Sequence, residues 1–305
     1  MKNHAFLFTA HKQPNLLART LRILAQDNHY FFVHVDSKTE AFGLFKEATE
    51  GIRNVTFMER MSLYHGGISH LYCVMNMLKE VMASSVHFDY IHMLSGQDYP
   101  LRSNLQFDNF FEHTDHSFMY FDQGAFKQSM LPVYHKMVDY YHSNQSGTIA
   151  YKIFEGLKVG RLLSFIYKRP PIENFASGWD WFSWSEPVYR FVVNELERNE
   201  SLVKRFNYTI TPTEHIFHTI LSTHVDEMKI ETDNPLRYVS WHPHRPVASD
   251  YRPFIFNESD FDYIIGRKAF FCRKVDEIES SKLLDMIDAC RGQAFDMNHA
   301  ASVIE

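Results

Sequence analysis

Short apolar runs alternate with stretches of helical periodicity along the first third of the chain. Runs rich in aromatic and β-branched residues, which are typical of buried strands, lie at 4–9, 30–35, 55–58 and 90–94. Apolar residues recur every three or four positions at 13–28 and 69–84, which predicts two amphipathic helices between those strands. Strands that alternate with helices predict an α/β fold built on a parallel sheet.

Polar residues follow these strands at the points where the strands end. His34 and Asp36 close the second run, and the turn SGQDYP at 95–100 follows the fourth. In parallel α/β sheets, ligands bind beyond the carboxyl ends of the strands. We therefore expect a binding site at this edge of the sheet.

The rest of the chain mixes helices with short strands. Helical patterns lie at 185–199, 212–224 and 275–290, and short strands rich in His, Arg and Tyr are expected within 236–276. The segment 151–169 is amphipathic and basic. We expect it to form a surface helix with a solvated basic face, and the alternative is a weak peripheral contact with an anionic membrane.

Composition narrows the class of protein. With 305 residues, of which 45% are hydrophobic and 22% charged, the chain is long enough for a large core and is not expected to be disordered. A formal net charge of −6 argues against a nucleic-acid partner, which would require a basic excess. The three cysteines form no CxxC pair, and the N-terminal apolar run is too short for a signal peptide. We therefore expect a cytoplasmic protein.

The sequence holds no motif that commits it to a metal or to a known phosphate loop. GxxxxGK[ST], GxGxxG and HExxH are all absent. The run WHPHRP at 241–246 offers two histidines on one side of a strand but no third ligand, which favours a structural or acceptor-contacting role. Asp260 and Asp262 form an Asp-x-Asp triplet, but their helical context predicts a solvated acidic face instead of a metal site.

Without a metal, a bound diphosphate would need cationic side chains. Guanidinium groups pair well with phosphate oxygens. The candidates are Arg252, Arg273 and Lys274. Local sequence alone does not distinguish them from ordinary surface cations.

Glu214 has two interpretations. Thr211, Pro212 and Glu214 match a capping box at the start of a helix. The alternative is a carboxylate that faces a cleft and takes the proton from an attacking sugar hydroxyl. Local sequence alone favours the capping box. The helix dipole would lower the pKa of Glu214 and desolvation would raise it, and the sequence does not settle which effect prevails.

Eight segments, in this order, resemble one family. The segments are HAFLFTAH, FFVHVDSK, YHGGIS, LSGQDYPLRSN, SGWDWFSWS, PTEHIFHTIL, YRPFIFNESDFDYI and FFCRKVD. The family is the core-2/I-branching β-1,6-N-acetylglucosaminyltransferases, which includes the peptide O-xylosyltransferases (glycosyltransferase family 14). The most specific match is LSGQDYPLRSN at 94–104, and Tyr64 stands where the family has Trp.

The resemblance implies a GT-A-like fold, in which a Rossmann-type nucleotide-binding sheet is flanked by helices in one compact catalytic domain over 1–305. Residues 1–120 would form the half that binds the donor nucleotide, and 121–305 the acceptor-binding and catalytic half. The implied reaction is inverting and needs neither a bound metal nor a cofactor besides the UDP-sugar donor.

The resemblance also assigns roles by position. Glu214 becomes the catalytic base, and the diphosphate ligands become Arg252, Arg273 and Lys274. The nucleotide would be bound by His11, His34 and Asp36. The donor and acceptor cleft would contain Gly66, Gly67, Gln97, Asp98, Trp179, Asp180 and Trp181.

We therefore expect a transferase, similar to a β-1,6-N-acetylglucosaminyltransferase, that moves GlcNAc or xylose from a UDP-sugar to a glycan or glycolipid hydroxyl. Animal members carry a Golgi anchor and several disulfides, and we expect neither in this protein. This difference favours synthesis of a bacterial surface polysaccharide in the cytoplasm or at the inner face of the membrane. The first alternative is a non-catalytic carbohydrate-binding protein on the same fold. The second is a sugar-phosphate nucleotidyltransferase, but its Gly-rich N-terminal loop is absent.

Overall fold

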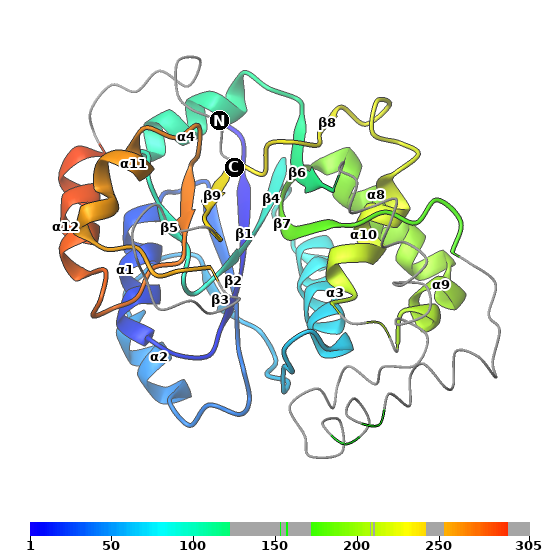
Figure 1. Cartoon of the computed structure of the whole chain (residues 1–305), viewed down its shortest axis with the longest axis horizontal. Coiled ribbons are helices and arrows are strands. Elements are labelled where there is room, and N and C mark those ends of the chain that lie inside the picture. The colour runs from blue at the N-terminus through cyan, green and yellow to red at the C-terminus, as the bar shows by residue number, and fades with distance from the viewer. Residues whose placement is uncertain are drawn as a thin grey trace.

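A seven-stranded mixed sheet runs through the middle of the molecule (Figure 1). The computed structural model describes residues 1–122, 153, 157, 172–207, 209, 211–241 and 253–291. In spatial order the strands are β3 (Val55–Phe57), β2 (His29–Val35), β1 (His4–Ala10), β4 (Tyr90–Ser95), β7 (Gly178–Ser185), β6 (Ser117–Phe121) and β8 (Ile230–Glu231). Neighbours from β3 to β4 are parallel, whereas β7 is antiparallel to both β4 and β6. The order β3-β2-β1-β4 is that of a Rossmann-type half, which confirms the predicted GT-A-like α/β fold class. The prediction of a parallel sheet holds for these four strands but not for the whole sheet, because β7 lies antiparallel to its neighbours.

Helices cover both faces of this sheet (Figure 1). One face carries α1 (Pro14–Leu24), α2 (Phe42–Ala48) and α4 (Asn104–Glu112). The other carries α3 (Ile68–Ala83), α8 (Glu186–Arg198), α9 (Glu200–Arg205) and α10 (Thr213–Leu221). Alternate residues of β1 enter the two cores, Phe6 and Phe8 on the α1 face and Ala5 and Leu7 on the α3 face.

A second, three-stranded sheet brings the end of the described chain back to the N-terminal half. It consists of β5 (Tyr99–Pro100), β10 (Phe271–Arg273) and β9 (Arg237–Val239), in that order. A third apolar cluster joins this sheet to 3₁₀-helix η2 (Glu258–Asp260), α11 (Phe261–Ile265) and α12 (Ser281–Cys290). Arg19 on α1 donates to Asp285 and Asp288 on α12, both at 2.7 Å. Because β5 closely follows β4 in the chain and pairs with β10, the small sheet places β10 next to the end of β4.

The closing helix predicted at 275–290 begins only at Ser281. Asp276 first forms a turn, in which its Oδ1 accepts from Ile278 N at 3.0 Å and its N donates to Ser280 Oγ at 2.9 Å. The segment 151–169 is described only at Ile153 and Leu157, so its predicted helix and membrane contact lie outside the described residues.

Two other sequence predictions concern residues that lie wholly or partly outside the described part of the chain, and a third concerns the division of the domain into two halves. Arg252 and the part of WHPHRP beyond Trp241 lie outside the described residues. The division between 120 and 121 falls within β6, and both halves contribute strands to one sheet. No helix among the described residues has the length and apolar content needed to cross a membrane.

Gly178, at the start of β7, is expected to tolerate no side chain. A Cβ at this position would lie 1.8 Å from Tyr120 O and 2.4 Å from His218 Nε2, and these two atoms are themselves joined by a 2.9 Å hydrogen bond. Gly178→Ala should lower the free energy of unfolding by about 3 kcal/mol, at the upper end for overpacking, because backbone atoms must move. Urea unfolding measures this change.

Gly43 provides the matched control, because an added Cβ there meets nothing within 4 Å and the residue lies within α2. Gly43→Ala should be neutral or stabilising by about 0.5–1 kcal/mol. Equal stability of the two variants would contradict the packing described at Gly178.

Candidate active site

The binding site was predicted at the edge of the sheet where β1, β2 and β4 end, and we call this the site edge. It contains groups from four strands. The last residues of β1 pair with the last residues of β2 and β4, so His11, Asp36 and the turn at 95–100 leave the sheet side by side. Because β7 is antiparallel to β4, its first residues, including Asp180, lie at the same edge. The structure thus brings the predicted nucleotide residues and part of the predicted cleft to one end of the sheet.

Two carboxylates interact at this edge, Glu214 on α10 and Asp180 on β7. Burial raises the pKa of Glu214 to about 8, and the negative charge of Asp180 contributes to this increase while a hydrogen bond with Thr211 opposes it. Burial also raises the pKa of Asp180, against a hydrogen bond with Thr213 and the positive charge of Arg273. A carboxylate with a pKa near neutral pH is well suited to act as a general base.

The start of α10 is held by the glycine loop at 64–69. Thr211 N donates to Gly66 O at 2.8 Å, and Glu214 N donates to Thr211 O at 2.9 Å. Gly66 has φ = 68°, a conformation that favours glycine, and Gly67 directly precedes α3. The capping-box interpretation of Glu214 is therefore wrong, because the Thr211 amide that its side chain would cap donates to Gly66 instead.

Arg273 forms the basic wall of the site. Its Nη1 donates to Ser95 Oγ and lies 3.7 Å from Asp98 Oδ2. The guanidinium carbon lies 4.9 Å from the centroid of the Trp181 ring, within the range of a cation–π contact. The guanidinium is thus oriented by three groups and remains 18% exposed.

The positive charges of Arg273 and Lys274 act on His11, which was predicted to bind the nucleotide. Burial lowers the pKa of His11, the charges of Lys12, Lys274 and Arg273 lower it further, and Asp36 opposes them. These groups come from separate segments and act on one another electrostatically. A diphosphate near His11 would therefore meet two cations from the end of β10.

Two hydrogen bonds join Gln97 to the segment that carries Lys274. Gln97 Nε2 donates to Val275 O at 3.3 Å, and Val275 N donates to Gln97 O at 3.1 Å. Lys274 consequently lies between strand β10, which is paired with β9, and Val275, which is hydrogen-bonded to Gln97. We infer that Gln97 positions the basic segment.

A buried ion pair supports the same wall. Arg237 Nε donates to Asp98 Oδ1 at 2.6 Å, with the two side chains 3% and 0% exposed. Ser95 donates to Asp98 Oδ2 from both its N and its Oγ, each at 2.6 Å. Asp98 is thus a positioning residue that lies between Arg237 and Arg273. Neither Arg237 nor Ser95 was among the predicted site residues. Arg237 belongs to no motif, and Ser95 lies in the SGQDYP turn, of which only Gln97 and Asp98 were assigned to the cleft.

The tryptophans have unequal surroundings. The Trp181 ring also lies under Arg237, 5.1 Å from its guanidinium carbon, so it supports both arginines of the site. Trp179 lies edge-on to Trp181, with 6.2 Å between ring centroids, and 4.7 Å from Tyr120. Both indoles, which were predicted to lie in the donor and acceptor cleft, are half-buried.

The predicted nucleotide residues His34 and Asp36 differ in charge. Burial lowers the pKa of His34 to about 4, and its Nε2 accepts from Met61 N at 3.0 Å, which makes it a neutral ring. It lines a cavity of about 420 Å³ that also includes Cys73. Burial alone would raise the pKa of Asp36, but hydrogen bonds from the backbone and side chain of Lys38 outweigh this effect and lower the pKa.

The expectation of a solvated acidic face at Asp260 and Asp262 is only half right. Asp262 is exposed, but Asp260 is fully buried and its Oδ2 accepts from Asn257 N at 2.7 Å. Asp260 and Asn257 form a reciprocal capping box at η2. The buried carboxylate is thus part of the local fold and not of the site edge.

A family model described as Core-2/I-Branching enzyme matches residues 4–265. Among curated proteins, "Xylosyltransferase 1" of Rattus norvegicus is 24% identical over 311 residues, which cover 93% of this chain and 35% of that protein. "Xylosyltransferase 2" of Homo sapiens is 24% identical over 310 residues, which cover 93% of this chain and 33% of that protein. The chain therefore spans about a third of the length of these relatives.

Solved glycosyltransferase structures are more distant. Galactosyltransferase LgtC in complex with donor and acceptor sugar analogues is 10% identical, with a TM-score of 0.42 over 96% of this chain and 98% of that chain. S. aureus TarS 1-349 in complex with UDP-GlcNAc is 14% identical, with a TM-score of 0.28 over 39% of this chain and 34% of that chain.

Proposed function

The chain belongs to the Core-2/I-branching enzyme family, and on that premise we propose that it is an inverting, metal-independent transferase that uses a UDP-sugar. The observation that carries this proposal is the arrangement of the site edge. A carboxylate with a raised pKa, Glu214, shares this edge with cations that extend toward the nucleotide residues. A base on one side and positive charge on the other are what a single displacement at an anomeric carbon requires.

In the proposed reaction the acceptor hydroxyl transfers its proton to Glu214 while its oxygen attacks C1 of the sugar. The C1–O bond to UDP breaks with its electron pair leaving on the diphosphate, so the configuration at C1 inverts. Arg273 and Lys274, together with Arg252, stabilise that charge. Asp180 Oδ1 is buried without a hydrogen-bond partner among the described residues, and we assign it to an acceptor hydroxyl.

The proposed donor sugar is xylose or GlcNAc. Xylose is supported by the names of the relatives, which are xylosyltransferases. GlcNAc, in a β-1,6 linkage, is the donor implied by the other branch. We propose a bacterial surface glycan or glycolipid as acceptor, with transfer taking place in the cytoplasm or at the inner face of the membrane.

Release of UDP tests the proposal directly. Incubation of the chain with UDP-xylose, UDP-GlcNAc and, as a comparison, UDP-galactose should give UDP release with one of the first two. Binding of a UDP-sugar or a glycan without any UDP release would instead support a non-catalytic carbohydrate-binding protein. Calorimetry on the same samples separates that outcome from a failure to bind.

EDTA is expected to leave the rate of UDP release within about twofold of the untreated value, because cationic side chains and not an ion neutralise the diphosphate. The measurement is a time course with and without EDTA, and with added Mn²⁺. A rate that vanishes with EDTA and returns with Mn²⁺ would show that the diphosphate depends on a metal.

The activity should rise with pH through the pKa of Glu214, since only the ionised carboxylate accepts a proton. Asp180→Asn should move this acidic limb to lower pH, because loss of a neighbouring negative charge favours the ionised form of Glu214. Asp122, which also raises that pKa, remains in this variant. The pH profile of kcat/KM for UDP release measures the limb, and an unchanged limb in Asp180→Asn would show that Asp180 does not act on the titrating base.

A further inference from the structure

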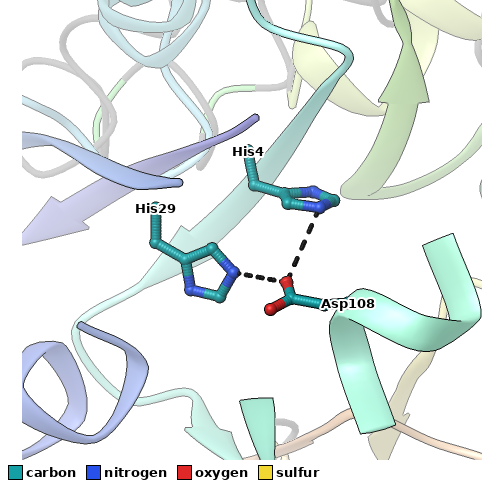
Figure 2. Close-up of side chains that lie close together, drawn as sticks. All are labelled: His4, His29 and Asp108. Carbon is teal, nitrogen blue, oxygen red and sulfur yellow. Dashed lines mark hydrogen bonds and ion pairs between the residues drawn. The ribbon is translucent and has the colours of Figure 1, made fainter. Parts of the chain in front are cut away.

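A polar cluster lies at the opposite end of the sheet from the carboxylate pair. His4 begins β1, His29 begins β2 and pairs with it in register, and Asp108 projects from α4 (Figure 2). Asp108 Oδ1 lies 2.8 Å from His29 Nε2 and 3.8 Å from His4 Nε2. The side chains of His4, His29 and Asp108 are 1%, 0% and 11% exposed, so the cluster contacts solvent only at Asp108.

Hydrogen bonding fixes the ring of His29. Its Nδ1 lies 2.6 Å from Leu24 O, and a carbonyl can only accept, so Nδ1 carries the proton. In a neutral ring, Nε2 then presents a lone pair to Asp108 Oδ1, which is also an acceptor. A positive species must therefore lie between His29 Nε2 and the carboxylate.

His4 is oriented in the same way. Its Nδ1 lies 3.0 Å from His92 Nε2, and His92 Nδ1 lies 2.9 Å from Ser183 Oγ. His4 Nε2 has a lone pair directed at Asp108 when His4 Nδ1 donates to His92 Nε2 and His92 Nδ1 donates to Ser183 Oγ, and this is the order that a bound ion would require. His4 Nε2 is buried and has no hydrogen-bond partner among the described residues.

From this convergence we propose that His4 Nε2, His29 Nε2 and Asp108 Oδ1 bind one divalent transition-metal ion of the zinc class. The three atoms lie within 4.8 Å of one another. Their separations of 2.8 and 3.8 Å lie on either side of the ~3.3 Å expected for two ligands each about 2.0–2.2 Å from a tetrahedral ion. Imidazole and carboxylate are ligands that zinc accepts, and a water entering beside Asp108 completes the four.

The surroundings match those of a metal site. Each histidine uses its other ring nitrogen in a hydrogen bond, to Leu24 O or to His92, as metal-bound histidines do. Asn28 Nδ2 donates to Asp108 Oδ1 at 3.3 Å. Phe107 packs edge-on against His4, with 5.2 Å between ring centroids, and contributes to an apolar wall.

The ion would be structural. It joins the amino ends of β1 and β2 to α4, whereas Glu214 and Asp180 lie at the other edge of the sheet. The inference is thus independent of the proposed transferase reaction. Removal of the ion is expected to lower the melting temperature, with UDP release retained below that temperature.

The test uses the full chain after dialysis against a chelator, titrated with Zn²⁺ in a calorimeter and by thermal unfolding. We expect one tight equivalent and a melting temperature that rises with Zn²⁺. Asp108→Asn and His29→Gln should each weaken binding by at least about 100-fold. His87→Gln is the matched control, because His87 is 56% exposed and lies 3.4 Å from Glu186 at the surface, and it should bind as the wild type does.

Co²⁺ added to the wild-type chain gives a second readout that does not depend on the folding of the variants. Intense visible bands, typical of four-coordinate Co²⁺, are expected and should disappear on addition of Zn²⁺. No tight Zn²⁺ binding by the wild type, equal binding by Asp108→Asn, or only the weak spectrum of six-coordinate Co²⁺ would overturn the proposal. In that case a proton on His29 Nε2 would be the cation of the cluster.

Discussion

Replacing Glu214 by Gln is expected to lower the rate of sugar transfer by about 10²–10⁴-fold, the range of general base catalysis, with little change in UDP-sugar affinity. Gln has nearly the same shape as Glu and still accepts a hydrogen bond from Thr211, but it does not take up a proton at neutral pH. The loss should therefore appear in kcat and not in donor binding. Single-turnover rates and calorimetry with the same UDP-sugar measure the two quantities separately.

Two controls make this result specific. Glu227→Gln makes the same change at an exposed position and should leave kcat unaltered. Asp180→Asn tests the other carboxylate of the pair, and we expect it to retain more activity than Glu214→Gln. If Glu214→Gln transfers sugar at the wild-type rate while Asp180→Asn is inactive, Asp180 is the base and the assignment to Glu214 is wrong.

Replacing Arg273 by Met should lower kcat by about 10²–10³-fold, because charge that develops on the departing diphosphate loses a preorganised donor. Arg273→Lys should be impaired as well, since a lysine cannot donate in two directions to phosphate or contact Trp181 as a planar guanidinium does. The measurements are kcat for UDP release and the inhibition constants of UDP and UMP. Weaker inhibition by UDP, with UMP less affected, would place the lost interaction at the β-phosphate.

Arg190→Met is a suitable control for Arg273→Met. Arg190 is 44% exposed and pairs with Glu186 on the surface of α8, so its loss should leave kcat unchanged. Lys274→Met should share the Arg273 phenotype in milder form. Wild-type kcat in both Arg273→Met and Lys274→Met would mean that the diphosphate is stabilised elsewhere.

Local pattern was sufficient to predict the four parallel strands of the large sheet and helices α1, α3, α8, α10 and α12, but not β6, β7 and β8. The buried runs at 4–9, 30–35 and 90–94 became β1, β2 and β4, because continuous apolar runs bounded by polar residues are typical of strands covered on both faces. The same pattern located Asp36 at a strand end, and the strand order then placed it at the site edge. The periodicity of apolar residues indicates which side chains are buried, and therefore which face of a helix or strand they occupy.

Local pattern failed where a partner is distant in the sequence. Thr211 and Glu214 fit a capping box, yet Gly66, on another loop, accepts the hydrogen bond from the Thr211 amide. Asp98 pairs with Arg237 only because β5, β9 and β10 form a small sheet. The pattern of apolar residues does not predict that these short strands pair. His4, His29 and Asp108 meet through strand register and the placement of α4, which one sequence does not specify.

The same limit applies to the carboxylate pair. From sequence, Glu214 is a polar residue near a helix start and Asp180 is a polar residue between two tryptophans. Their interaction depends on the packing of α10 against β7, and it is this interaction, together with burial, that raises the pKa of Glu214. The proposed function thus depends on the tertiary structure, and the resemblance to the family pointed to both residues although local pattern did not.

The anomeric configuration of the first product tests the central claim most directly, because a single displacement with one base must invert C1. Proton NMR should follow an α-linked UDP-sugar donor from the first minutes of reaction, using slow transfer to water where no acceptor has been identified. We predict that the sugar appears first as the β-anomer and only later equilibrates with the α-anomer. Initial appearance of the α-anomer would contradict the account, since it requires retention and a different arrangement of catalytic groups.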